Sequence, residues 1–325
     1  MKPKILLILL FISLYSFGQS SKLLGLWILD KYTLKNGNPI EVNNKDFSTF
    51  AEYQFFNNKM IIDGTEIPIT ITEKNIDTKA AKINYEFKGN YLLLNFDGTE
   101  KIAYLLKPEN FIELYPEFKP MQQNTDGENL YLENAIVKPE FNYVGGFNSY
   151  LRNIFGNYQN YPKSKNYFKA QFIITKNSKI LEPKVINSIS SDFDKMAIDA
   201  IKNSEKYFKN STGKDFLLTR YFTMNIIDNG NEKLEKEDKQ INQIEQKGFA
   251  YYNKNEFENA IKEYEKIKNI DFKNSNNSKV KYSLIRLGVS YLAINRIDEA
   301  CANFRLVGGL TDFQVRNYLI NFCQK

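Results

Sequence analysis

Residues 139–147 read Pro-Glu-Phe-Asn-Tyr-Val-Gly-Gly-Phe and open the stretch that decides the fold of the middle of this chain. Apolar and polar residues then alternate over 168–175, which is typical of a half-buried strand, and 180–186 form a second strand-like run. Apolar residues within 193–201 share one helix face, and residues 216–226 alternate again. The order helix, strand, strand, helix, strand predicts a three-stranded antiparallel sheet covered on one face by two helices.

This order, the motif P-x-F-x-x-x-G-G-F and the later Tyr161-Pro162 resemble the C-terminal domain of TonB, the energy transducer of Gram-negative bacteria. The resemblance covers 139–227 and implies strand addition, in which an exposed sheet edge pairs with an extended peptide of an outer-membrane receptor. The partner-binding edge would be 216–226. Its candidate contact residues are Phe216, Leu218, Arg220 and Phe222. The alternative is that this strand serves only its own sheet.

Composition argues against catalysis and against nucleic-acid binding. The 325 residues allow two or three domains, and the formal charge of +6 is spread along the chain without a clustered basic face. The absence of histidine removes the commonest metal ligand and the usual general base near neutral pH. Asp192 and Asp194 would point apart on a helix, where Asp192 is expected to cap the start. We therefore expect no enzyme activity, cofactor or metal site.

The N-terminus is typical of an exported protein. Lys2 and Lys4 precede an apolar run over 5–17, and the small residues Ser16 and Gly18 suit a cleavage site, so residues 1–18 are interpreted as a signal peptide. The apolar run is shorter than the hydrocarbon core of a bilayer, which favours cleavage. The alternative is that residues 1–18 remain as an uncleaved anchor. The expected location is the periplasm or the cell envelope, with membrane association only through partners.

Residues 22–116 predict a small antiparallel β-barrel. Tight turns separate eight strand-like runs, at 25–30, 47–56, 60–62, 67–71, 83–87, 91–96, 102–106 and 111–115. Gly25 and Trp27 are similar to the G-x-W signature of lipocalins, which implies a lipocalin-like barrel. Such a barrel is either filled by its own side chains or holds one small ligand. A carrier or sensor of a small apolar ligand is therefore an alternative function. The polar stretch 117–138 is interpreted as a linker.

A second linker is expected at 228–240, and a helical repeat follows over 241–325. Four positions recur with spacings of 3, 9 and 4 residues: Gly248, Tyr251, Ala260 and Tyr264, then Gly288, Tyr291, Ala300 and Phe304. This pattern resembles tetratricopeptide (TPR) repeats, whose first helices line a binding groove. The groove candidates implied are Asn242, Glu245, Phe249, Tyr252, Asn253, Tyr282, Ile285, Val289 and Leu292. Alternatively, these residues are buried against another domain or a second copy.

The two cysteines leave one more question open. Cys301 and Cys323 could form a disulfide in an oxidising compartment or remain two buried thiols. Altogether the sequence predicts a multi-domain α+β protein that makes non-catalytic protein–protein contacts in the cell envelope, and the TonB resemblance implies a role as an accessory to TonB-type transport. The expected partners are envelope proteins or extended peptide segments, and not nucleic acid.

Overall fold

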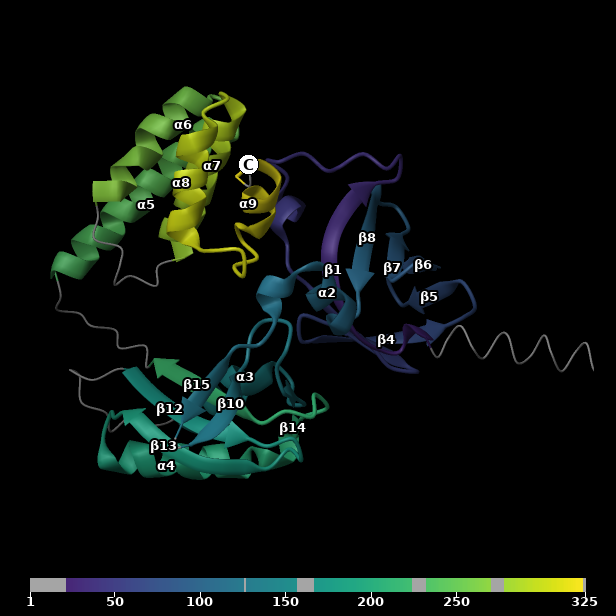
Figure 1. Ribbon diagram of the computed structural model, residues 1–325. Coiled ribbons are helices and arrows are strands. Elements are labelled where there is room, and N and C mark those ends of the chain that lie inside the picture. The colour runs from purple at the N-terminus through teal and green to yellow at the C-terminus, as the bar shows by residue number, and fades with distance from the viewer. Residues whose placement is uncertain (1–21, 126, 157–166, 224–231, 270–277, 324–325) are drawn as a thin grey trace, which may run out of the picture. The chain divides into compact units, whose positions relative to one another are not determined.

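The computed structural model describes residues 22–125, 127–156, 167–223, 232–269 and 278–323 (Figure 1). The expected signal peptide and Tyr161-Pro162 lie outside these residues. The fold is mixed α+β, with a closed β-barrel near the N-terminus and several helices near the C-terminus. The chain divides into two compact units: one contains 1–28, 51–92 and 106–228, and the other contains 29–50, 93–105 and 229–325.

Eight strands close the barrel in sequence order. They are β1 (Gly25–Leu34), β2 (Glu52–Phe55), β3 (Lys59–Ile62), β4 (Thr65–Ile71), β5 (Asn75–Thr78), β6 (Lys82–Lys88), β7 (Tyr91–Phe96) and β8 (Lys101–Leu106). The predicted Asp63-Gly64 turn joins β3 to β4, and both residues have the positive φ that a tight hairpin requires.

Three segments of the barrel sequence differ from the prediction. Residues 111–115, expected to be a strand, lie mostly in helix α2 (Pro108–Leu114), because Pro108 suits the first turn of a helix and only Phe111 is buried. The strand β5 was missed because Ile76 is its single fully apolar residue. The run 47–56 was expected to be one long strand, but its first two residues belong to the 3-10 helix η1 (Lys45–Ser48) and only 52–55 form β2.

The central sheet has five strands in the order β13-β12-β15-β10-β9. The three predicted strands are β12 (Tyr167–Ile174), β13 (Ile180–Asn187) and β15 (Phe216–Thr223). Helices α3 (Gly146–Phe155) and α4 (Ser191–Asn203) supply Leu151, Phe155 and Phe193 to the core that covers one face. Short elements complete this part: η2 (Pro116–Phe118), β11 (Glu140–Phe141), η3 (Glu205–Tyr207) and β14 (Phe208–Lys209), with β11 paired to β14.

The stretch 117–138, predicted as a linker, instead supplies the other two strands of this sheet. They are β9 (Gln122–Thr125) and β10 (Glu128–Leu132), joined by a turn in which Gly127 has φ +87°. The side chains of β9 lie at the outer edge and are mostly exposed, so the sequence has no alternation of apolar residues that would predict this strand. Leu130 of β10 is nevertheless buried against Ile173 and Leu217. Polar composition alone therefore gave the wrong interpretation here.

The C-terminal helices are α5 (Glu232–Tyr252), α6 (Phe257–Tyr264), η4 (Glu265–Asn269), α7 (Ser278–Ala293), α8 (Ile297–Val307) and α9 (Arg316–Phe322). Residues 232–240, expected within a linker, belong to α5, and Ile241 and Ile244 of this helix are buried. Cys301 and Cys323 form a disulfide between α8 and the end of α9, with a Cα–Cα separation of 5.7 Å. Among the described residues, no helix is long and apolar enough to span a membrane.

Candidate functional site

The strand β15 has one fully paired side and one partly paired side. On the first side, β12 pairs with all eight of its residues without a shift of register. On the other side, β10 runs parallel to β15 and pairs only with Phe216 and Leu217. The predicted partner-binding edge is therefore closed by the chain itself at its beginning. From Leu218 to Thr223, no described strand lies on that side.

The backbone groups at this open part can be assigned from the hydrogen-bond pattern. The amide of Tyr131 donates to the carbonyl of Asp215 (2.9 Å), so the peptide groups of Asp215 face β10. Successive residues of a strand direct their N–H and C=O groups to opposite sides. Those of Thr219 and Tyr221 therefore face the open side, whereas those of Leu218 and Phe222 face β12. We call Thr219–Thr223 on this side the open edge.

Arg220 and Glu133 lie beside the open edge. The guanidinium of Arg220 makes a two-pronged contact with the carboxylate of Glu133, through Nη1 to Oε1 and through Nη2 to Oε2 at 3.0 Å. Nη1 also donates to the carbonyl of Thr219 (3.1 Å), and the guanidinium lies 5.3 Å from the ring centre of Phe147. Only 18% of the Arg220 side chain and 24% of the Glu133 side chain are exposed. This fork geometry is the strong form of an arginine–carboxylate pair.

The other predicted contact residues of β15 are part of the core. Phe216 and Leu218 are fully buried, and Phe222 packs against the same cluster, with its ring 5.0 Å from that of Phe155. Their side chains are therefore not available to a partner. On the opposite face of the sheet, Tyr167 and Tyr221 are exposed with ring centres 5.8 Å apart, and Lys169 Nζ lies 5.5 Å from the Tyr221 ring.

The predicted groove residues differ in their exposure. Phe249 and Tyr282 are exposed, and Arg286 stacks 4.3 Å from the centre of the Phe249 ring while it pairs with Glu245 (2.7 Å). Tyr252, Ile285 and Leu292 are partly buried, Val289 is buried and Asn253 is exposed; Asn242 accepts a hydrogen bond from Lys279. The structure thus brings only part of the predicted set to the surface.

The connection between β1 and β2 packs against the same helical core. Val42 and Phe47, which lie between β1 and β2, pack against the helical core, and the Phe47 ring lies 4.9 Å from that of Tyr318 in α9. The hydroxyl of Tyr318 donates to the carbonyl of Val42 (3.2 Å), and the amide of Asn317 donates to that of Phe47 (2.7 Å). These contacts are made with Asn317 and Tyr318, so the alternative that the groove residues are buried against another domain or a second copy stays a prediction.

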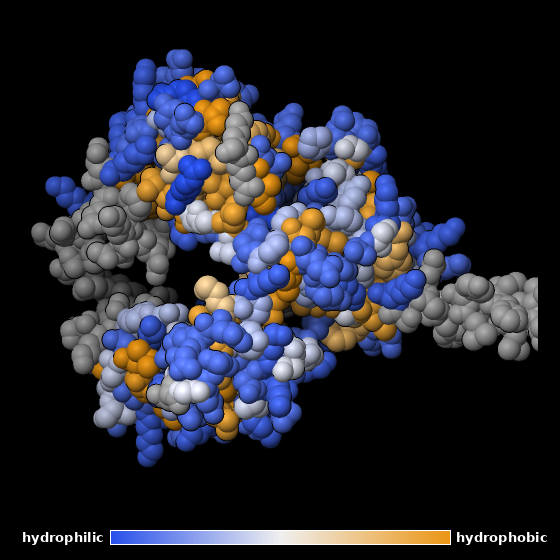
Figure 2. All heavy atoms as spheres, viewed as in Figure 1, coloured by the Kyte–Doolittle hydropathy of each residue, from blue (hydrophilic) through white to orange (hydrophobic). Residues whose placement is uncertain are grey.

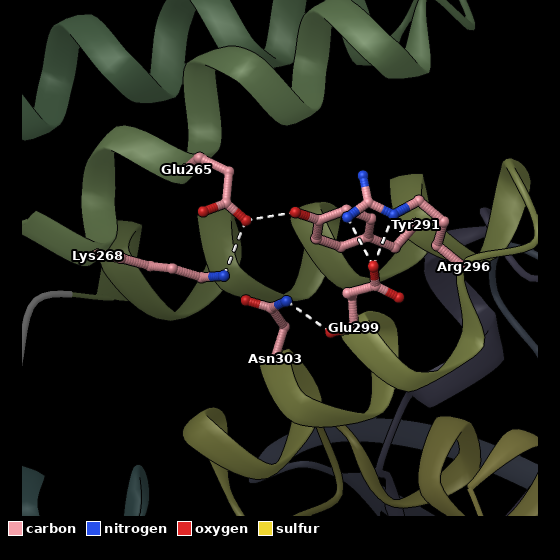
Figure 3. A network of polar contacts seen from close by, with 6 residues as sticks. All are labelled: Glu265, Lys268, Tyr291, Arg296, Glu299 and Asn303. Carbon is pink, nitrogen blue, oxygen red and sulfur yellow. Dashed lines mark hydrogen bonds and ion pairs between the residues drawn. The ribbon is translucent and has the colours of Figure 1, made fainter.

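A polar network joins the helices of this part (Figure 3). Glu265 accepts hydrogen bonds from Lys268 (2.8 Å) and from the hydroxyl of Tyr291, and Arg296 donates twice to Glu299. Burial favours the neutral form of Glu265, but the hydrogen bonds from Lys268 and Tyr291 outweigh it and hold its pKa below the usual 4.5. Burial, and then the hydrogen bond to Glu265, raise the pKa of Tyr291 to about 12. These groups are paired with one another and form a structural network.

Trp27 also has a structural position. It is almost fully buried, its indole N–H donates to the carbonyl of Leu23 (2.8 Å), and Lys107 Nζ lies 4.4 Å from its ring centre. Lys107 in turn donates to the carbonyl of Leu24 (2.6 Å), and burial lowers its pKa, opposed by the nearby carboxylate of Glu109. The inward residues of the barrel strands are large and buried, among them Phe55, Met60, Ile76, Ile83 and Leu94. No observation favours a ligand cavity there.

The acidic pair singled out in the sequence, Asp192 and Asp194, lies in the first turn of α4. Ser190, and not Asp192 as predicted, caps α4, because its hydroxyl accepts the amide of Phe193 (3.3 Å). Asp192 lines a shallow hollow of about 630 Å³ together with Ile154, Lys195 and Asp199. Among the described residues, no group of three or more Cys, Asp or Glu side chains could hold a metal ion. Figure 2 shows that hydrophobic residues reach the visible surface only in separate patches between larger hydrophilic areas.

Two parts of the site escaped the sequence reasoning. Glu133 lies in the supposed linker, and Phe47 was assigned to the predicted strand 47–56, so neither was expected to make these contacts. An acidic residue directly after the Leu-Tyr-Leu run at 130–132 was the only available signal for Glu133. Comparisons of the chain with known protein families, with curated proteins and with solved structures found no match.

Proposed function

We propose that this protein is a non-catalytic interaction protein of the cell envelope that binds an extended peptide segment of another protein along the open edge of β15. The observation that carries the proposal is the half-paired strand: Thr219 and Tyr221 direct peptide groups to a side on which no described strand lies. Strand addition uses such groups for affinity and alternate side chains for selectivity. The exposed ring of Tyr221 stands next to these groups.

The contacts of the motif at 139–147 support the proposed TonB-like character of residues 139–227. Gly145 and Gly146 have φ +80° and +74° at the start of α3, and a Cβ on Gly145 would collide with Ser149. Phe141 and Phe147 pack edge to face with ring centres 5.0 Å apart. The motif therefore shapes the entry to α3 and its packing. On this proposal the chain is an accessory of TonB-type transport, and its contacts form in the periplasm or at the envelope.

The proposed TPR character rests on a contact that occurs twice. Gly248 lies against the ring of Tyr264, and Gly288 lies against the ring of Phe304, so that a Cβ at either glycine would come under 3.0 Å from ring atoms. These are the equivalent positions of the two sequence repeats. The exposed Phe249 and Tyr282 would be a second partner-binding surface. The Cys301–Cys323 disulfide suits an oxidising compartment, which supports the proposed export.

The test uses the direction of single peptide groups. In Tyr221→Pro, the proline removes an N–H that faces the open side, so the pairing of β15 with β12 stays intact. Tyr221→Ala is the matched control, since it removes the same side chain and keeps the N–H. A photo-crosslinking residue in place of Thr219, introduced in the full chain in envelopes, should capture a defined partner.

We expect Tyr221→Pro to abolish that crosslink and Tyr221→Ala to retain most of it, with circular dichroism verifying that both variants are folded. A crosslink to the same partner in Tyr221→Pro would refute strand addition at this edge. A second crosslinking residue is placed at the exposed Lys74 of the barrel as a control. Equal capture of the same partner at Lys74 and at Thr219 would also refute strand addition at this edge.

A further inference from the structure

The strand β10 shows how the chain itself occupies this side of β15. Its backbone pairs in parallel with Phe216 and Leu217, and the Tyr131 ring lies 6.1 Å from that of Phe216. Its last contact is made by a side chain, since the carboxylate of Glu133 continues to Arg220 after the paired backbone ends. The segment Leu130–Glu133 is therefore an internal example of what this edge accepts.

The backbone leaves the edge directly after Glu133. Asn134 turns the chain away, because its side-chain amide donates to the carbonyl of Phe118 (2.7 Å) and its backbone N–H donates to that of Val137 (3.0 Å). Only the Glu133 carboxylate extends beside the open edge. A strand that paired with Thr219 and Tyr221 would enter the space that this carboxylate now shares with Arg220.

Displacing Glu133 without replacement is unfavourable. Arg220 is mostly buried between the Phe147 ring and the edge, and a mostly buried guanidinium that loses its carboxylate keeps the cost of its desolvation without the compensating pair. An incoming strand with a neutral residue in the place of Glu133 would leave the guanidinium of Arg220 mostly buried and without a carboxylate partner. A strand with a carboxylate would restore the two-pronged contact.

We propose that the segment accepted by the open edge carries an aspartate or glutamate that takes the place of Glu133 on Arg220. Glu133 is then an internal competitor that neutral segments cannot displace. The open edge therefore prefers extended segments that carry a carboxylate. This inference names the chemistry of the partner and rests on the proposed strand addition.

The chain provides its own probes. The first is a peptide with blocked ends and the sequence of residues 128–133, Glu-Asn-Leu-Tyr-Leu-Glu, and the second is the same peptide with glutamine in last place. Binding of each to the full chain is measured by fluorescence anisotropy at physiological ionic strength, where exposed charges more than about 8 Å apart are largely screened. The protein variants are Glu133→Gln, which removes the competitor, and Arg220→Gln, which removes the receptor.

We expect the Glu133→Gln chain to bind the acidic peptide about tenfold more tightly than the amide peptide, the size of one hydrogen-bonded charge pair. The Arg220→Gln chain should bind both peptides equally. If both peptides bind the Glu133→Gln chain with equal affinity, and Tyr221→Pro abolishes that binding, strand addition stands and the acidic preference is refuted. If neither peptide binds, the acidic inference fails, while the proposed function is decided separately by the crosslink at Thr219.

Discussion

At the scale of single residues, the packing of the helical repeat requires glycine at two positions, 248 and 288, because no larger residue fits there. Gly288 leaves no space for a side chain beside the buried ring of Phe304, whereas Gly309 has nothing within 4 Å of an added Cβ and no positive φ. Glycine is unfavourable inside a helix, so its presence at 288 reflects this close approach. The sequence spacing found these positions because the constraint is local and repeats.

We predict that Gly288→Ala destabilises the protein by about 1–3 kcal/mol, the usual cost of forcing a methyl group into a packed core. Gly309→Ala, the matched control, should leave stability unchanged or raise it slightly. Urea unfolding of the full chain, followed by far-ultraviolet circular dichroism, measures both. Equal stability of the two variants would mean that the Phe304 ring moves aside at little cost.

Tyr291 makes stability depend on pH. Its pKa is raised from 10.0 to about 12 in the folded protein, by burial and by its hydrogen bond to Glu265. A group with a raised folded pKa contributes its full stability below the unfolded pKa and loses it as pH rises through the folded value. We therefore predict a fall in stability between about pH 10 and pH 12.

Replacing Tyr291 by Phe should reduce that fall, although it costs the hydrogen bond to Glu265 at neutral pH. Urea midpoints of wild type and Tyr291→Phe at a series of pH values measure the difference. Tyr264, whose pKa is also raised to about 12, contributes in the same direction, so some dependence remains in the variant. Parallel pH profiles for the two proteins would contradict this role of Tyr291.

At the scale of elements, sequence patterns predicted those strands and helices that have one buried face. Phe168, Ala170 and Phe172 alternate into the core, and β12 was found. The hairpin of β9 and β10 was missed because only Leu130 and its neighbours touch the core, and the direction of its pairing with β15 depends on residues about 85 positions apart. Half of the candidate site, Arg220, was therefore visible in the sequence, and its counterpart Glu133 was not.

A disulfide joins the end of the short helix α9 to α8. The two cysteines are 22 residues apart, and closing a loop of that length restricts the unfolded chain. We predict that the double variant Cys301→Ser, Cys323→Ser loses about 3 kcal/mol in stability. A dithiol reductant should destabilise wild type by a similar amount and leave the double variant unaffected. A wild type that is indifferent to reductant would show that packing alone holds α9.

At the scale of the whole molecule, the connection between β1 and β2 joins the barrel sequence to the helical part within one compact unit. No hydrophobic pattern in the sequence predicts this contact, because Phe47 and Tyr318 are far apart in the sequence and meet only in the folded chain. An ion pair between Lys101 of β8 and Asp46 of η1 fixes the same connection to the barrel. Sequence patterns describe each module separately, and a contact of this kind decides whether the modules unfold together.

We predict that Phe47→Ala uncouples α9 from the barrel connection and costs about 2 kcal/mol, roughly half the value for a fully buried phenylalanine, since Phe47 is partly exposed. Hydrogen exchange should become faster at 316–322, where the Phe47 ring contacts Tyr318 and Phe322, and remain unchanged in β12 and β15. Phe222→Ala is the converse control, because its core belongs to the central sheet. If Phe47→Ala accelerates exchange equally in both regions, the contact with α9 is not a local coupling but part of one global unfolding step.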